Sequence, residues 1–325
     1  MAKRLTDLDI MQGIAMTLVV LGHHLFDFMP EWYEKMFNYI YTFHMPLFIF
    51  ISGFLVRYSY KRIQNREEYW KYIIKRAQKF ALPYIIIGTI IALTTFKIDD
   101  INIFINNMIN LFISPRQGAA IFLWYIHLLF IFYCIAPLIF NSNKYVKFFL
   151  FIFALLLSFI PIPIHLFNID YFARYFIFFL LGAFIAKHYE YVYIIKKVKM
   201  FMLLVIFIIM SFAYFMEYKS FLLCYAMQWI SIPAFYCITS FIMHWDAARN
   251  ALVYVSMNCF GVYLLHMFFV KAGSIIIAIQ PFNIPSHYYI IYLLVSTFIS
   301  ISATAYIWNK YLSKRMYSNK ITISK

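Results

Sequence analysis

The chain has 325 residues, of which 64% are apolar and only 13% are charged. A soluble domain averages about 45–50% apolar and roughly 25% charged residues, so this composition excludes an ordinary soluble protein and indicates an integral membrane protein. The net charge of +15 would otherwise suggest nucleic acid, but the basic residues lie between apolar runs, as residues that set membrane topology do. We therefore expect membrane lipids around the chain and no nucleic-acid partner.

Ten apolar runs approach the ~20 residues that a bilayer span needs. In chain order they cover roughly residues 10–28, 39–60, 80–96, 119–140, 146–162, 171–188, 199–217, 221–243, 251–272 and 288–309. The stretch 101–113 is shorter and rich in asparagine, so we expect it in a loop or at the membrane interface. Since no polar linker divides the chain, the prediction is one all-α polytopic membrane domain over residues 1–325, with about ten transmembrane helices.

The distribution of Lys and Arg tests the ten-span prediction. If the N-terminus is cytoplasmic, the inner segments hold 22 of the 28 basic residues and the outer segments hold 6. Such an excess in cytoplasmic segments is usual in membrane proteins, and an odd number of spans would destroy it. We therefore expect both termini to be cytoplasmic. The four cysteines lie inside apolar runs without metal-binding spacing, so we expect neither a disulfide nor a metal site.

Ionisable side chains inside apolar runs are unfavourable and need an explanation. In the first run, Gln12 and His23 are separated by about three helical turns, so a helix would place both on one face. Asp27 follows His23 by four residues and could hydrogen-bond its ring, whereas His24 would point to a different face. For a lone histidine, the simpler interpretation is a hydrogen bond to a neighbouring helix.

Three further histidines fall at the depth of His23 when the runs are followed from their expected outer ends. They are His44, His127 and His266. At 1.5 Å of rise per residue, the four lie within a band of ~5 Å in the outer third of the bilayer. This band suggests one polar cavity that opens to the outer side, although histidines that favour the interface would give the same pattern.

The start of the third run is strongly basic. Lys75, Arg76 and Lys79 stand at its expected cytoplasmic end, and the last two project from one helix surface. Pro83 is expected to kink the helix or to open its backbone. Arginine–lysine pairs suit phosphate groups, but a topology signal in contact with anionic lipids explains the same residues without a ligand.

Six sequence blocks then stand out, in the order LDIMQGIAMTLVVLGHH (8–24), FHMPLFIFISGFLV (43–56), KRAQKFALPY (75–84), LWYIHLLFIFYCIAPLI (123–139), YFIFFLLGAFIAK (175–187) and GVYLLHMFF (261–269). Together they resemble the bacterial acyltransferase-3 family, in its stand-alone branch of fucose O-acetylase-like proteins. The resemblance implies a multi-pass protein of the bacterial inner (cell) membrane, with an acyltransferase core of roughly residues 8–312. It also implies transfer of an acyl group, commonly acetyl, from cytoplasmic acyl-CoA to a hydroxyl of a surface glycan or lipid-linked sugar.

The resemblance also implies roles for single residues. The family's essential histidine falls on His23, and the basic residue that precedes it in the family falls on Gln12, which keeps hydrogen bonding but loses the charge. The family's basic pair falls on Arg76 and Lys79. Its Leu-Trp motif of the fourth helix falls on Trp124 and Tyr125, which we expect in the substrate cavity with His44, His127 and His266.

The chemistry expected of such an enzyme needs a base, an orienting group and fixed cations. Histidine suits the base because its pKa is close to ambient pH. We expect His23 to be that base, with Asp27 as its orienting partner and with Gln12 or a group from another helix as alternatives. The donor's phosphates would lie on Arg76 and Lys79, next to Lys75. A transporter or flippase of lipid-linked glycans, and a catalytically inactive relative, remain the rival interpretations.

Overall fold

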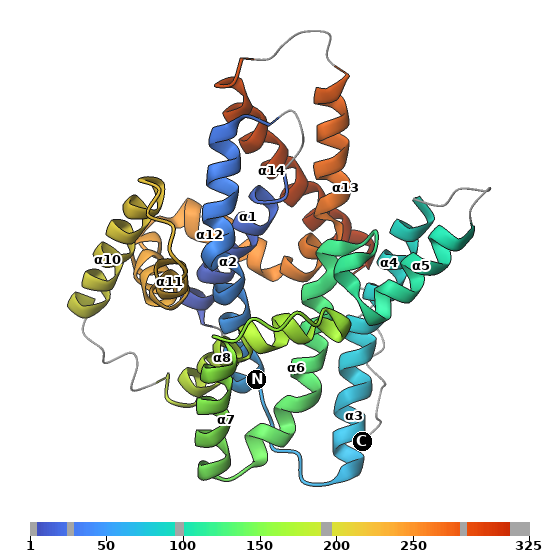
Figure 1. Ribbon diagram of the computed structural model, residues 1–325, viewed down its shortest axis with the longest axis vertical. Coiled ribbons are helices and arrows are strands. Elements are labelled where there is room, and N and C mark those ends of the chain that lie inside the picture. The colour runs from blue at the N-terminus through green and yellow to red at the C-terminus, as the bar shows by residue number, and fades with distance from the viewer. Residues whose placement is uncertain (1–4, 25–28, 95–100, 190–196, 280–284, 313–325) are drawn as a thin grey trace. The chain divides into compact units, whose positions relative to one another are not determined.

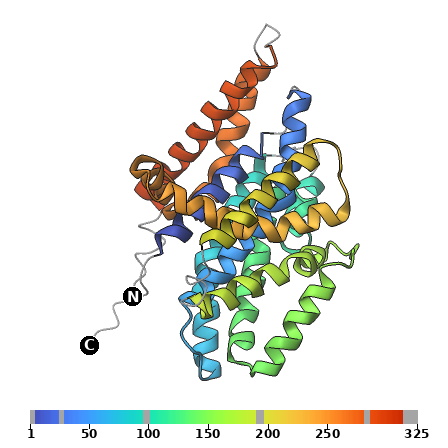
Figure 2. The ribbon, with the colours of Figure 1, turned by 90° about the vertical axis from the view of Figure 1, so that its left-hand side faces the viewer.

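The computed structural model describes residues 5–24, 29–94, 101–189, 197–279 and 285–312 (Figure 1, Figure 2). All regular structure in these ranges is helical, which confirms the predicted all-α class. The chain forms two compact units: the first unit is Lys3–Phe48 with Glu190–Lys325, and the second unit is Ile49–Tyr189. Helix α2 (Glu31–Tyr58) contributes its first part to the first unit and its last part to the second.

The first unit is organised around α1. Its described helices, besides the start of α2, are α1 (Thr6–Leu21), α10 (Lys197–Phe215), α11 (Phe221–Ile242), α12 (Asp246–Met257), α13 (Cys259–Ala278) and α14 (Tyr288–Ile307). Helix α1 packs against α11, α12, α13 and α14. Helices α10 and α11 lie side by side in Figure 1, as do α13 and α14 in Figure 2. The helix that carries the histidine motif is therefore the centre of this unit.

The second unit contains the remaining described helices and the end of α2. They are α3 (Arg66–Arg76), α4 (Leu82–Thr94), α5 (Ile101–Ile113), α6 (Trp124–Asn141), α7 (Lys144–Leu157) and α8 (Ile169–Lys187). Helices α2 and α8 approach closely, since a β-carbon at Gly53 would meet the backbone of Phe179 and one at Gly182 would meet the backbone of Phe50. Only glycine allows this separation at those two positions.

Among the described residues, seven helices are long and apolar enough to cross a membrane. They are Glu31–Tyr58, Arg66–Thr94, Ile121–Asn141, Leu166–Lys187, Phe221–Ile242, Cys259–Ala278 and Tyr288–Tyr311. The other three expected spans correspond to α1, α7 and α10, of which α1 and α7 have 16 and 14 residues. The count of ten thus stays a prediction, as does the cytoplasmic placement of the termini, which lie outside the described residues.

The structure contradicts one expectation about the helices and narrows another. The run 251–272 is divided at Asn258, whose backbone leaves the helical conformation and whose side-chain amide donates to the Tyr254 carbonyl. The stretch 101–113, expected in a loop or at the membrane interface, is helix α5, which excludes the loop. Its asparagines do not break the helix, because Asn107 accepts a hydrogen bond from the backbone N–H of Ala119 in the following turn. The interfacial position of α5 stays a prediction.

The backbone next to Pro83 opens as expected. A π-helical turn, Ala77–Ala81, joins α3 to α4 immediately before the proline. Proline has no N–H for the carbonyl four residues earlier, here that of Lys79, and its ring displaces that carbonyl. A widened turn relieves both effects without ending the helix, so Arg66–Thr94 continues as one apolar element.

Candidate active site

His23 lies just beyond α1 and not within it. The helix ends at Leu21, and Gly22 follows as its C-terminal cap, whereas the sequence predicted a helix through residue 28. The buried Tyr33 stabilises this end, because its hydroxyl donates to the Leu21 carbonyl at 2.7 Å and accepts from the backbone N–H of His24 at 3.0 Å. Tyr33 therefore fixes the backbone that carries His23.

The His23 ring is oriented by its own helix. Its Nδ1 lies 2.5 Å from the carbonyl oxygen of Val19, and a carbonyl oxygen can only accept. Nδ1 therefore carries the ring proton, and Nε2 presents its lone pair. Asp27, the expected orienting partner, lies outside the described residues, so that role stays a prediction.

Three of the four histidines predicted to share a cavity come together in the first unit. The rings of His23 and His266 lie 4.9 Å apart, and Tyr41 lies between His23 and His44, with ring separations of 6.3 and 4.5 Å. His44 and His266 are buried, while His23 is partly accessible. The remaining one, His127, belongs to the second unit, so a cavity common to all four stays a prediction.

The helices that carry His44 and His266 extend beyond the apolar runs from which the depths of these histidines were counted. Helix α2 starts at Glu31, not near residue 39, and α13 continues to Ala278, not 272. The extension of α2 includes charged residues, whereas that of α13 is mostly apolar. The shared depth of the histidines stays a prediction. Their convergence with His23 nevertheless agrees with the expected cluster.

His24 has a different environment from His23. Its side chain is completely buried, its Nδ1 lies 3.0 Å from the Val20 carbonyl, and its Nε2 lies 3.0 Å from the Ser296 hydroxyl on α14. Because Nδ1 donates to the carbonyl, Nε2 accepts from the serine. Both ring nitrogens thus have partners, one on α1 and one on α14, which indicates a structural role.

Gln12 lies in the first half of α1, in a polar cluster that is separate from His23. Its side-chain oxygen accepts a hydrogen bond from the Ser256 hydroxyl at 2.8 Å, and a carboxylate oxygen of Asp9 lies 3.3 Å from the same hydroxyl. Eleven residues of helical rise correspond to ~16 Å, so Gln12 is too far along α1 to orient the ring of His23. The alternative in which Gln12 orients the base is therefore excluded.

The basic candidates of the third run do not share one environment. Arg76 is half-buried and lies over the rings of Tyr72 and Tyr133, at 5.0 and 4.6 Å. Lys79, three residues later and within the π-helical turn, is also half-buried and interacts electrostatically with Arg76. Lys75 is exposed. Two adjacent cations suit an anionic ligand.

The remaining candidates form an aromatic region of the second unit. Trp124 packs against Tyr171 at 4.3 Å between ring centroids, and the hydroxyls of Tyr125 and Ser52 are hydrogen-bonded at 2.6 Å. His127 accepts at Nδ1 from the amide of Asn168, which is buried in left-handed backbone.

Several supporting residues were not predicted from the sequence. Tyr33 and Tyr41 look like ordinary aromatic residues in a chain that is 22% aromatic. Ser256 and Ser296 are single hydroxyls in apolar helices, and nothing in the local sequence indicates their partners on α1. A left-handed, non-glycine Asn168 next to a helix start has a weak signal, since asparagine adopts that conformation more readily than most residues.

Tyr33→Phe tests the support of the histidine loop. Removal of the hydroxyl leaves two buried backbone groups without their partner, so we expect a loss of about 1–3 kcal/mol in stability and a fall in kcat smaller than that caused by loss of His23. Thermal unfolding and initial rates measure the two effects. Tyr218→Phe, at a side chain that is 72% exposed, is the control. An unchanged Tm for Tyr33→Phe would contradict the assignment.

Comparison with known proteins agrees with the resemblance carried by the motifs. The model of the acyltransferase-3 family, described as an acyltransferase domain, matches residues 5–305. No curated protein and no solved structure matches the chain. The family match includes both units, and the helices that could cross a membrane lie within it or extend just past its end. The chain therefore belongs to the acyltransferase-3 family and is a membrane acyltransferase.

Proposed function

We propose that this protein is an O-acetyltransferase that moves an acetyl group from cytoplasmic acetyl-CoA to a sugar hydroxyl of a cell-surface or lipid-linked glycan. The observation that carries the proposal is the His23 ring, which is oriented by Val19, accessible and surrounded by His266 and Tyr41. A histidine held in one tautomer with its other nitrogen available is the arrangement that a general base needs.

The proposed reaction transfers the acyl group from the sulfur of CoA to a hydroxyl oxygen of the sugar. Nε2 of His23 accepts the proton of the sugar hydroxyl as the hydroxyl oxygen attacks the carbonyl carbon of the thioester. The carbon–sulfur bond then breaks, and the CoA sulfur leaves with the proton that His23 returns. An ester forms, CoA is released as a thiol, and the imidazole regains its starting state. No metal takes part in these steps.

Arg76 and Lys79 are the proposed ligands of the donor's phosphate groups. Arginine binds phosphate oxygens with two parallel hydrogen bonds, and lysine adds a compact charge. The rings beneath Arg76 hold its guanidinium group in one orientation, which reduces the entropy lost on binding. Lys75 is exposed, so we assign it a smaller contribution through long-range charge.

The proposed acceptor contacts of the second unit are Trp124, Tyr125 and His127, and those of the first unit are His44 and His266. Aromatic rings suit sugars, because the faces of pyranose rings carry C–H groups that pack on them while the hydroxyls bond to polar neighbours. Trp124 is partly accessible, which leaves its ring available to a ligand. We place the protein in the bacterial inner membrane, where cytoplasmic acyl-CoA and lipid-linked glycans are both present.

The test uses the full-length protein in membrane vesicles with acetyl-CoA and a glycan extract, and it measures the release of free CoA thiol. The proposal expects release that depends on both substrates. Release without glycan would indicate hydrolysis only, and no release with any acyl-CoA would contradict the proposed donor. The assay is repeated with succinyl-CoA. Release of CoA from succinyl-CoA but not from acetyl-CoA would indicate transfer of a different acyl group, whereas release from neither would indicate a different reaction.

Gln12→Arg tests whether the missing charge limits the enzyme. An arginine at this position would stand one turn after Asp9, where an i,i+3 ion pair can form. We expect the transfer rate to be equal or higher, as measured by initial rates at saturating acetyl-CoA. Gln12→Met, which cannot accept from Ser256, is the control and is expected to be slower. Inactivation by Gln12→Arg would show that Gln12 has a distinct role here.

A further inference from the structure

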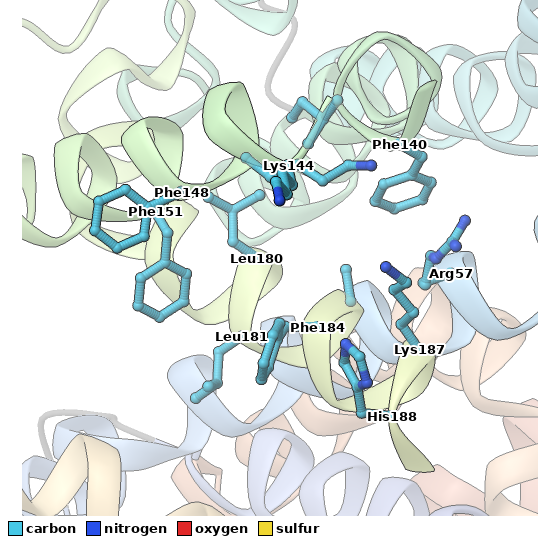
Figure 3. Close-up of a pocket in the computed structure, with 13 residues that line it drawn as sticks. Arg57, Phe140, Lys144, Phe148, Phe151, Leu180, Leu181, Phe184, Lys187 and His188 are labelled. Carbon is cyan, nitrogen blue, oxygen red and sulfur yellow. The ribbon is translucent and has the colours of Figure 1, made fainter. Parts of the chain in front are cut away.

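The second unit contains a cavity that is separate from Arg76 and Lys79. It has a volume of about 530 Å³ and lies among the ends of α2, α6, α7 and α8. Four cationic side chains line it, namely Arg57, Lys144, Lys147 and Lys187. In Figure 3, Arg57 and Lys187 lie beside each other at one end of the cavity, while Phe148 and Phe151 line the opposite end.

The charges that line this cavity favour an anionic ligand. The ion pairs found among the described residues do not include any of its four cations, and no described carboxylate lines it. Lys147 interacts unfavourably with Lys187 and Arg57. Lys144 and Lys147 also stand in the first turn of α7, where the helix dipole disfavours cations. Cations that only set the membrane topology would not need to line one cavity together.

The remaining lining is apolar, apart from His188. Eight of the thirteen residues are aliphatic or aromatic, and they include Phe148, Leu180 and Phe184. Phe148 is 61% exposed and Phe184 is 58% exposed, so the cavity opens at the surface of α7 and α8. In a membrane protein, an exposed apolar helix surface contacts lipid chains. The site thus combines an anion-binding end with an opening toward lipid.

We propose that this cavity binds an anionic phospholipid with two phosphate groups, of the diphosphatidylglycerol (cardiolipin) class. Two phosphodiesters bring two negative charges to the four cations, and the acyl chains leave along Phe148 and Phe184 without needing polar partners. Basic pockets between transmembrane helices are a known setting for such head groups. Free phosphate shares the anionic chemistry but not the apolar part. The adenine, ribose and pantetheine amides of CoA would lack hydrogen-bond partners in so apolar a site.

The experiment uses the purified full-length protein in a neutral detergent and measures ligand binding by the shift in Tm and by native mass spectrometry. Its arms are cardiolipin, phosphatidylcholine, inorganic pyrophosphate and CoA. We expect cardiolipin to bind and to raise Tm, while phosphatidylcholine and pyrophosphate leave Tm unchanged. Equal binding of phosphatidylcholine would overturn the proposal. A shift by pyrophosphate as large as that by cardiolipin would overturn it in favour of a free-phosphate site.

Variants of the cationic residues test whether cardiolipin binds in this cavity. The triple variant Arg57→Gln/Lys144→Gln/Lys187→Gln should weaken cardiolipin binding by about 100-fold, since each cation contributes about a factor of five. The control Lys61→Gln/Arg62→Gln removes exposed charges from the same unit and should change binding less than about twofold. Equal weakening by both would overturn the proposal. If the triple variant does not fold, competition on the wild-type protein decides: displacement of bound cardiolipin by CoA overturns the proposal, and retention supports it.

Discussion

Replacement of His23 by alanine is expected to lower the rate of acyl transfer by about 10²–10⁴-fold, the usual effect of losing a general base. The protein should still insert and purify normally, because His23 is only half-buried and the bond that orients it is to its own helix. Initial rates with saturating acetyl-CoA, normalised to the amount of folded protein, give the comparison.

His24→Ala is the matched control, one residue away in the sequence. It removes a buried side chain that bonds to Val20 and Ser296, so we expect a lower Tm with a rate per folded molecule close to that of the wild type. A near-normal rate for His23→Ala would refute the mechanism. A loss of rate in His24→Ala equal to that in His23→Ala would show that the variants act through folding.

The double variant Arg76→Gln/Lys79→Gln is expected to raise the KM for acetyl-CoA by roughly 10²–10⁴-fold, since each charge-assisted hydrogen bond contributes ~1.5–3 kcal/mol to binding. The KM for the glycan should change little, because the proposed contacts are to the phosphates of the donor. Steady-state kinetics with each substrate varied in turn separates the two constants.

Lys71→Gln is the control for this variant. Lys71 also lies on α3, but it is exposed and already paired with Glu67 at 2.5 Å, so its neutralisation should leave both KM values nearly unchanged. An unchanged donor KM in the double variant would contradict the assignment of the phosphates. Loss of inserted protein would indicate that the two cations act only as a topology signal.

The sequence predicted the helical class well because apolar length and the distribution of charge report directly on insertion into a bilayer. It predicted helix ends less well. Asn258 divides one expected span, and the charged start of α2 adds eight residues before residue 39. Both depend on hydrogen bonds and packing that an apolar run does not encode.

The sequence predicted residues of the candidate site, but it did not predict the contacts that these residues make. The sequence predicted that His23, His44 and His266 lie together because it placed them at one depth, and their rings do converge. The Val19 carbonyl was not predicted as the partner of His23, because the end of α1 at Leu21 depends on the distant Tyr33. Likewise, Arg57 and Lys187 are 130 residues apart in sequence, and only the fold shows that they face one cavity.

The central claim is best tested by mass spectrometry of surface and lipid-linked glycans from cells that lack the gene. The cells are complemented with the wild-type protein or with His23→Ala at matched expression. The account predicts a mass increment of one acetyl group on a sugar, lost on deletion, restored by the wild type and not restored by His23→Ala. Glycans of identical acylation in all three strains would contradict it, and so would full restoration by His23→Ala.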